Sequence, residues 1–156
     1  KNIIELDKKN SKGMFSEEEI IALIKENFGV DEGSKNILTI NNRKFRSKMV
    51  LNNLLWIEFN SFFKEATGTK DYKLICDKFD WIFINSFEYF DDDSIDIIRR
   101  FISFIDIAYK EKTKVKFFFN HKDISRIYSG TKLDILWKRC ASRLLEMKNY
   151  DYLEDE

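Results

Sequence analysis

The second half of the chain alternates apolar runs with helical patterns, and this alternation constrains the fold more than any other feature. Two apolar runs, FDWIFINSFEYF and TKVKFFFNHKD, are each followed by an amphipathic segment, DDDSIDIIRRFISFIDIAYKEK and LDILWKRCASRLLEMKNYDY. Short apolar runs that alternate with helices are typical of parallel strands joined by crossover helices. We therefore predict an α/β fold with a predominantly parallel sheet, whose working residues lie at the carboxyl ends of the strands.

The first half of the chain predicts a helix followed by a β-hairpin insertion. Ser16 and Glu19 have the spacing of a capping box ahead of a helix over residues 16–28. The segment ILTINNRKFRSK then places Asn41 and Asn42 between two strand patterns. Asparagine tolerates the left-handed backbone that a tight hairpin turn needs, so the two strands are predicted to pair there.

Length and charge limit the domain organisation and the classes of partner. A chain of 156 residues favours a single domain, with the polar residues 1–15 as an incoming linker. The chain starts at Lys1 rather than Met, which indicates an excised domain or a processed product. Its 27 basic and 27 acidic residues cancel, so we do not expect nucleic acid as a partner. No apolar run approaches the ~20 residues that span a bilayer.

The sequence offers no convincing metal site. Cys76 and Cys140 are far apart without CxxC spacing, which favours two buried free thiols in a reducing compartment over one disulfide. His121 is the only histidine, which excludes a multi-histidine metal site. The run Asp91–Asp93 could hold Mg²⁺, but it precedes a long helix with Ser94 as a candidate cap. There, carboxylates interact favourably with the helix dipole, so a structural role is favoured.

Several phrases, in the same order along residues 36–153, resemble one protein family. They are LLWIEFNSFFKEATGTKDYKLICDKFD, FDWIFINSF, IIRRFISFIDIAYKEKTKVKF, IYSG and KRCASRLLEMKNYDYL. This ordered set resembles the ZapE family of AAA-like P-loop ATPases, whose eukaryotic members include the mitochondrial lactation-elevated protein. The chain departs from the family pattern at Asn120–His121, where the family has Ser-Ala, and at Cys140, where it has Thr.

The resemblance implies half of a P-loop NTPase-like fold, namely the carboxyl-terminal half of an ATPase that remodels or chaperones protein partners. The implied settings are protein quality control and cell division, in the mitochondrion of a eukaryote or the cytoplasm of a bacterium. In the family the Walker A and B motifs lie upstream, and no GxxxxGK[ST] occurs in this sequence. ATP and Mg²⁺ are therefore expected for the parent protein, with none bound and none hydrolysed by this fragment alone. The implied partners are the upstream P-loop half, protein clients and further copies of the chain.

Two arginines are the main candidates for function. Arg139 and Arg143 are four residues apart, so they lie on one helix face and need a compensating anion. That anion is either a carboxylate of the domain, such as Glu146, or a nucleotide phosphate contacted by a sensor or an arginine finger. The resemblance favours Arg143 for the second role.

Three weaker candidates lie elsewhere. Asn120 ends an apolar strand, where a polar residue can contact nucleotide or water, although a cap or turn role is favoured. Arg99 and Arg100 are candidates for partner binding. Because adjacent helix positions differ by about 100° in direction, these two arginines cannot share one task.

The hairpin supports an alternative function. Lys44, Arg46 and Lys48 recur at period two and could bind phosphates, but no aromatic residue lies between them in a stacking pattern, and a solvated face is favoured. A non-catalytic adaptor that binds proteins through the hairpin and the helix over 94–111 is the alternative to an ATPase part.

Overall fold

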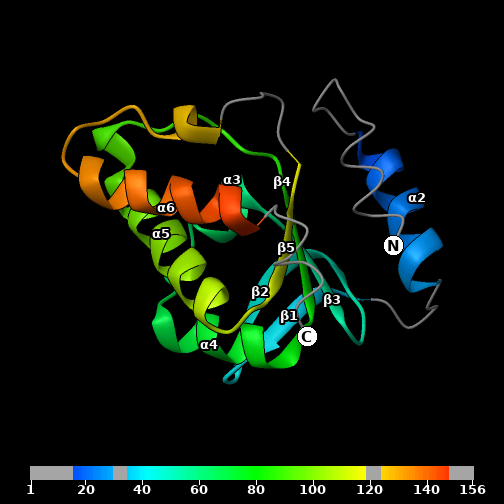
Figure 1. The fold of residues 1–156 in the computed structure, drawn as a ribbon. Helices are drawn as coiled ribbons and strands as arrows, with labels where there is room; N and C mark the ends of the chain where they lie inside the picture. The colour runs from blue at the N-terminus through cyan, green and yellow to red at the C-terminus, as the bar shows by residue number, and fades with distance from the viewer. Residues whose placement is uncertain (1–15, 30–34, 119–123, 148–156) are drawn as a thin grey trace.

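The computed structural model describes residues 16–29, 35–118 and 124–147 (Figure 1). The helices and strands, with two short 3₁₀ helices labelled η, are in chain order α2 (Glu17–Phe28), β1 (Lys35–Ile40), β2 (Arg43–Val50), β3 (Leu54–Glu58), α3 (Phe59–Phe62), α4 (Thr69–Lys78), β4 (Trp81–Asn85), η1 (Asp92–Ser94), α5 (Ile95–Lys110), β5 (Lys114–Phe117), η2 (Ile124–Ile127) and α6 (Asp134–Met147).

The strands form one mixed sheet of five strands in the order β1-β2-β3-β4-β5. Strands β3, β4 and β5 are parallel, with α4 connecting the first pair and α5 the second. Strands β1 and β2 are antiparallel to each other, and β2 is antiparallel to β3. The sheet is therefore mixed rather than predominantly parallel. The hairpin is not a separate insertion, because it pairs with the edge of β3 that would otherwise expose unpaired backbone groups.

The predicted hairpin turn is confirmed. Asn41 and Asn42 both have positive φ values, 53° and 63°. Two consecutive left-handed residues are the requirement of a type I′ turn, whose twist matches that of the flanking strands. Asparagine is one of the few residues with a side chain that adopts this backbone at low cost.

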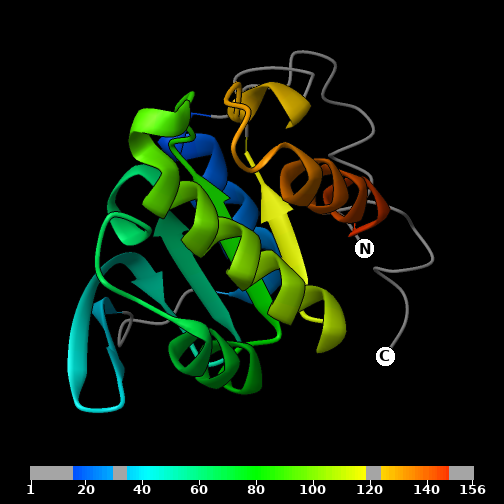
Figure 2. The ribbon, with the colours of Figure 1, turned by 90° about the vertical axis from the view of Figure 1, so that its left-hand side faces the viewer.

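Helices cover both faces of the sheet (Figure 2). Strand residues alternate between the faces, so neighbouring positions enter different clusters. One cluster combines sheet residues with α3, α4, α5 and α6, and its sheet members include Leu55, Ile57, Ile82, Ile84, Val115 and Phe117. The other lies under α2 and includes Leu54, Trp56, Trp81 and Phe83. Both faces of the parallel strands are therefore buried, which explains why β3 and β4 are apolar at successive positions.

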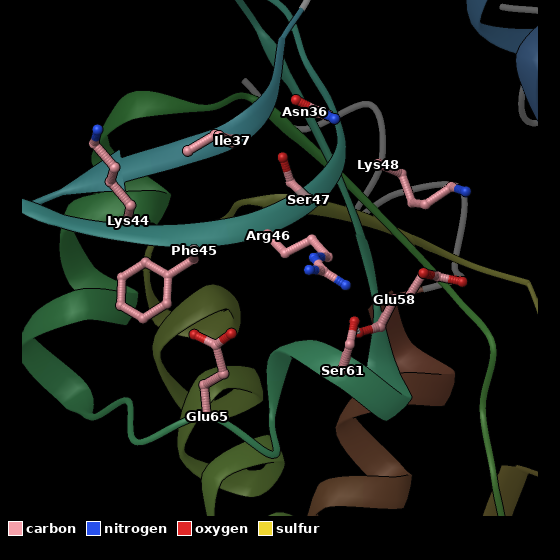
Figure 3. Close-up of a pocket in the computed structure, with 10 residues that line it drawn as sticks. All are labelled: Asn36, Ile37, Lys44, Phe45, Arg46, Ser47, Lys48, Glu58, Ser61 and Glu65. Carbon is pink, nitrogen blue, oxygen red and sulfur yellow. Dashed lines mark hydrogen bonds between the residues drawn. The ribbon is translucent and has the colours of Figure 1, made fainter.

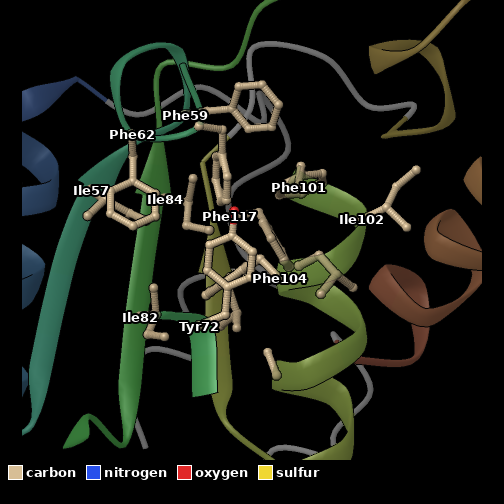
Figure 4. Packing of buried hydrophobic residues seen from close by; sticks show 14 of the residues in the cluster. Ile57, Phe59, Phe62, Tyr72, Ile82, Ile84, Phe101, Ile102, Phe104 and Phe117 are labelled. Carbon is tan, nitrogen blue, oxygen red and sulfur yellow. The ribbon is translucent and has the colours of Figure 1, made fainter. Parts of the chain in front are cut away.

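The predicted crossover at the centre of the fold is confirmed. Strands β4 and β5 are parallel neighbours, and α5 connects them. Four α5 residues at helical spacing are buried on one side of the helix, namely Ile98, Phe101, Ile102 and Ile105. Figure 4 shows Phe101 among the aromatic residues of this face. Its ring centroid lies 4.8 Å from that of Phe59 and 5.4 Å from that of Phe63.

The two helices with predicted caps begin differently. At α2 the Ser16 hydroxyl accepts from the Glu19 N–H at 3.1 Å, and the Glu19 carboxylate accepts from the Ser16 N–H at 3.1 Å, which confirms the capping box. At α5, Ser94 occupies the N-cap position as predicted, but its side chain makes no capping hydrogen bond. Asp91 instead caps η1 by accepting from the Asp93 N–H at 2.9 Å.

Phe101→Ala should lower the free energy of unfolding by about 3–5 kcal/mol, because Phe101 is fully buried and its loss leaves a cavity between α5 and the sheet. Urea denaturation of the 156-residue chain measures this change. Arg99→Ala, two residues earlier on the exposed side of α5, is the control, with an expected change within about 0.5 kcal/mol. A loss below about 1 kcal/mol at Phe101 would contradict the packing described here.

Candidate functional site

The two candidate arginines meet one carboxylate between α5 and α6. Arg143 Nη1 donates to Asp106 Oδ1, and Arg139 Nη2 lies 3.5 Å from Asp106 Oδ2. Asp106 belongs to α5, whereas both arginines belong to α6. Within this domain the compensating anion is therefore Asp106, a carboxylate of another helix, which is one of the two alternatives that the sequence left open, and not the nearby Glu146.

Two further residues complete this polar contact, which we call the α5–α6 seam and define as Asp106, Tyr109, Arg139, Arg143 and Glu146. The Arg143 guanidinium carbon lies 5.0 Å from the centroid of the Tyr109 ring, a cation–π distance. The Tyr109 hydroxyl donates to Glu146 Oε2 at 2.7 Å. This bond is the main reason that the pKa of Tyr109 is raised. The seam therefore alternates positive and negative groups along the contact between α5 and α6.

The seam joins two of the sequence phrases that carry the family resemblance. Asp106 and Tyr109 come from RRFISFIDIAYKEK, and the two arginines and Glu146 come from KRCASRLLEMKNYDYL. Sequence reasoning weighed the arginines but missed Asp106 as their partner. The sequence did contain a signal for this partner, namely an aspartate within the apolar run ISFIDIAY. A carboxylate in such a position needs a cation from a neighbouring element.

The Arg143 guanidinium retains unused hydrogen-bonding capacity. Its side chain is 23% exposed, and that of Arg139 is 53% exposed. Arginine carries five N–H donors, and Asp106 is the one hydrogen-bond acceptor that Arg143 has among the described residues. An anion from outside the domain can therefore still bind. The seam is, however, removed from the carboxyl ends of the strands, because Asp106 lies in the half of α5 that leads to the start of β5.

The weaker candidates are dispersed. Arg100 Nη1 donates to the Phe63 carbonyl at 3.0 Å, so it holds α5 against the segment after α3, whereas Arg99 is exposed on another side of α5. The two adjacent arginines thus have different surroundings, as expected from helix geometry. Asn120 lies outside the described residues, as does His121.

The carboxyl ends of β3 and β4 form a small polar cluster that sequence reasoning did not assemble. Trp56 Nε1 donates to Asn85 Oδ1 at 2.9 Å, and the Ser86 hydroxyl donates to Glu58 Oε2 at 2.8 Å. Ser86 has φ of 57°, the left-handed region that is uncommon for serine. Parallel pairing places Glu58 opposite Asn85. The sequence signal for this cluster was Glu58, the acidic residue that follows the apolar run LLWI. The carboxyl ends of parallel strands are where α/β sheets bind ligands.

The basic residues of the hairpin divide into paired and unpaired groups. Arg43 Nη1 donates to Asp71 Oδ2 at 3.2 Å and Lys48 pairs with Glu17, so both serve the fold. Lys44 and Arg46 have no ion pair within the described residues. They line a groove of about 670 Å³ between the hairpin and α3 (Figure 3). The groove is lined by Asn36, Ile37, Lys44, Phe45, Arg46, Ser47, Lys48, Glu58, Ser61 and Glu65.

Asp92 anchors the loop that leads into α6. Its carboxylate accepts from the Tyr128 hydroxyl and from the backbone N–H of Thr131 at 3.0 Å. The hydrogen bond from Tyr128 is the largest cause of a lowered pKa at Asp92, followed by that from Thr131. A Cβ at Gly130 would overlap both Asp92 and Tyr128, which explains the glycine of the IYSG phrase. The acidic run is structural at this position, as predicted.

Thiol and metal chemistry find little support in the described residues. Cys76 and Cys140 are free and buried, as predicted. Burial raises the pKa of Cys76 to about 11 and also raises that of Cys140, so neither is a thiolate at neutral pH. No group of three or more His, Cys, Asp or Glu in the described ranges is arranged to hold a metal ion.

Within residues 16–29, 35–118 and 124–147, no helix is both long and apolar enough to cross a membrane.

Comparison with known proteins identifies a family. A family model described as AFG1-like ATPase matches residues 8–156. This match confirms the family expected from the ordered phrases, because a ZapE-like ATPase is consistent with it. No curated protein and no solved structure matches the chain.

Asp92→Asn should make the stability of the chain less sensitive to acid. The folded-state pKa of Asp92 is lowered, so its contribution is complete above the unfolded value of about 3.9 and is lost as pH falls through the folded value. Urea midpoints from pH 7 to pH 3 should fall less steeply in the variant than in the native chain. Asp93→Asn, an exposed acid whose carboxylate bonds to none of the described residues, should retain the native slope. Identical slopes for Asp92→Asn and the native chain would contradict the anchor.

Proposed function

The chain belongs to the AFG1-like ATPase family, and from this premise we propose that it is the carboxyl-terminal part of an ATPase that remodels or chaperones protein partners. The observation that carries the proposal is the extent of the match, residues 8–156, in a sequence without a GxxxxGK[ST] motif. We propose that the Walker A and B motifs of the ATPase lie outside these 156 residues.

The fold is compatible with a part of a P-loop NTPase. Strands β3, β4 and β5 are parallel and in sequential order, with α4 and α5 as crossovers that contact each other. This arrangement belongs to the same α/β class as P-loop proteins. The antiparallel β1 and β2 are not part of that arrangement. We therefore propose the relation to a P-loop fold for the parallel strands only.

We propose that the residues of this chain do not by themselves form a site for ATP and Mg²⁺. A phosphate cradle needs consecutive backbone N–H groups at the start of a helix, which the missing glycine-rich motif would supply. The strand-end acid that could approach a metal, Glu58, instead accepts from Ser86. The family implies that the complete protein uses nucleotide and Mg²⁺, so the binding groups must come mainly from elsewhere in that protein.

We propose that Arg143 contributes a guanidinium to the assembled ATPase, as a sensor or an arginine finger, with Arg139 in support. The free donors of Arg143 and its partial exposure support this role. Asp106 would hold the side chain in place before the external anion binds. Arg99, which is exposed, is proposed for partner contact together with Arg100, and Asn120 for nucleotide contact.

Further proposals concern partners and setting. The proposed partners are the P-loop half of the same protein, protein clients and further copies of the chain, with no nucleic acid. The proposed settings are protein quality control or cell division in a mitochondrion or a bacterial cytoplasm. An adaptor that binds proteins without catalysis is the second candidate, and the groove beside the hairpin favours it. A P-loop motif encoded upstream of Lys1 in the same reading frame would favour the ATPase over the adaptor.

The 156-residue chain alone should show no steady ATP turnover, because it lacks the phosphate cradle. The rate of ATP turnover is measured as phosphate released in the presence of Mg²⁺ and ATP. The longer protein that contains the P-loop is the positive control. A turnover rate that survives purification and scales with the concentration of this chain would refute the proposal.

Arg143→Ala in the complete protein should lower ATP turnover by about tenfold or more, because arginine fingers and sensors stabilise charge in the transition state. The matched control is Asp106→Asn, which removes the negative charge of the internal partner but keeps a side-chain oxygen that can accept from the Arg143 guanidinium and hold it in place. We expect Asp106→Asn to retain most of the turnover.

The two variants also separate catalysis from structure. Urea denaturation of the 156-residue chain should show losses of about 1 kcal/mol or less for each, as for a partly exposed ion pair. If Arg143→Ala and Asp106→Asn lower stability equally and both leave turnover intact, the arginine is structural and the catalytic role is wrong.

A further inference from the structure

The groove beside the hairpin exists because β2 separates from β3 before β3 ends. The antiparallel pairing of these strands consists of Met49 with Trp56 and Val50 with Leu55. Continuing that register would pair Ser47 and Lys48 with Glu58 and Ile57, but no such pairs form. The sheet therefore opens at the carboxyl end of β3, and the opening leaves strand positions without a neighbour on that side.

An irregularity in β2 accompanies this opening. Lys35 pairs with Val50 and Ile37 pairs with Arg46, so one residue of β1 faces three residues of β2. Such a bulge bends a strand and redirects its side chains, and bulges are frequent beside binding sites. The bulge lies at Ser47, which lines the groove. The Ser47 hydroxyl is buried and has no hydrogen-bond partner, which is uncommon in a folded protein.

The charges in the groove are of both signs and are incompletely paired. Figure 3 shows Arg46 reaching into the space between β2 and α3, with Glu65 rising from the opposite side. Neither Arg46 nor Glu65 has an ion pair among the described residues, and Lys44 has none either. Glu58 accepts from Ser86 and Lys48 pairs with Glu17. The unpaired groups are thus two cations and one carboxylate.

We infer that this groove binds an extended peptide segment that carries acidic side chains. The segment would lie along the opening between β2 and β3 and supply the missing strand-like hydrogen bonds, as in recognition by strand addition. An acidic side chain of the peptide meets Arg46, whose guanidinium reaches into the groove, and the Ser47 hydroxyl bonds to the peptide backbone. The alternation of side chains along a strand places acidic groups on one face of the peptide.

The mixed charge argues against a polyanion such as nucleic acid. Glu58 and Glu65 line the same groove as the cations and would repel successive phosphates. No aromatic ring stacks between the cations in the way single-stranded nucleic acid requires, since Phe45 packs inward against Phe62. A peptide can place a neutral side chain beside Glu58 or Glu65 and an acidic one beside Arg46, and its backbone can pair with the free strand positions. Every nucleotide of a nucleic acid carries a phosphate, so a nucleic acid cannot separate its charges in this way.

Fluorescence anisotropy of the 156-residue chain with a labelled peptide of alternating threonine and glutamate tests the inference. The comparison probes are the threonine–lysine peptide, a proline-substituted threonine–glutamate peptide and labelled oligo(dT). We expect measurable binding of the threonine–glutamate peptide, and binding at least about tenfold weaker for the proline-substituted peptide, which lacks backbone N–H groups.

Three variants connect the binding to the groove. Arg46→Ala should weaken binding about tenfold, as for loss of a charged hydrogen bond. Ser47→Ala should weaken it severalfold without lowering stability, because the hydroxyl has no partner in the free protein. Lys138→Ala, which removes an exposed cation of α6 that does not line the groove, should leave binding unchanged. Circular dichroism confirms that each variant is folded.

Specific results would overturn the inference. The first is that the folded native chain does not bind the threonine–glutamate peptide. The second is that Arg46→Ala binds this peptide as tightly as the native chain does. The third is that the native chain binds oligo(dT) more tightly than the peptide. The inference that the groove binds a peptide depends on the proposed ATPase function in one respect only. That function identifies the peptide as a segment of a client protein. Peptide binding is measured without ATP, so a chain that does not bind the peptide would leave the ATPase proposal unaffected. Conversely, a complete protein that does not hydrolyse ATP would leave the inference of peptide binding unaffected.

Discussion

The packing of α5 on the parallel strands is the interaction on which the rest of the structure depends. Phe101 is fully buried, and its ring contacts rings from α3, from the segment after β4 and from α6. This one side chain therefore joins the crossover helix to α3, to the segment after β4 and to the helix with the candidate arginines. Because aromatic residues bury large areas in close contact, displacement of α5 would disturb all three neighbours together.

The positions of the arginines follow from this packing. Helix α6 contributes Trp137, Cys140, Ala141 and Leu144 to the core beside α5, so its opposite flank places Arg139 and Arg143 at the edge of the contact. Asp106 on α5 then lies within reach of both. Asp106 compensates one of the two guanidinium charges, and Glu146, which accepts from the Tyr109 hydroxyl, brings the formal charge of the seam to zero. Arg143 nevertheless keeps N–H donors that Asp106 does not use. An external anion would therefore find a partly satisfied cation, held in position before binding.

Sequence reasoning was most successful where local patterns decide the structure. The capping box at Ser16, the turn at Asn41–Asn42 and the buried face of α5 all depend on neighbours along the chain. It failed where the outcome depends on distant segments. The pairing of the hairpin with β3, the choice of Asp106 as the anion and the groove at Ser47 each join residues separated by a turn or several elements. Neither hydrophobic period nor turn chemistry specifies which free strand edge a hairpin will cover.

The ends of β3 and β4 show how the chain differs from a complete P-loop unit. Where such an enzyme places acids that reach a metal, this chain has Asn85 bonded to Trp56 and Glu58 bonded to Ser86. These groups satisfy one another and leave no acid cluster among the described residues. The unsatisfied polar groups lie instead in the groove beside the hairpin, and unused donors remain at the α5–α6 seam. Buried polar groups are normally paired within a protein. The unpaired Ser47 hydroxyl makes the groove the region of the described residues that departs from this rule, and this is the region for which we propose a peptide partner.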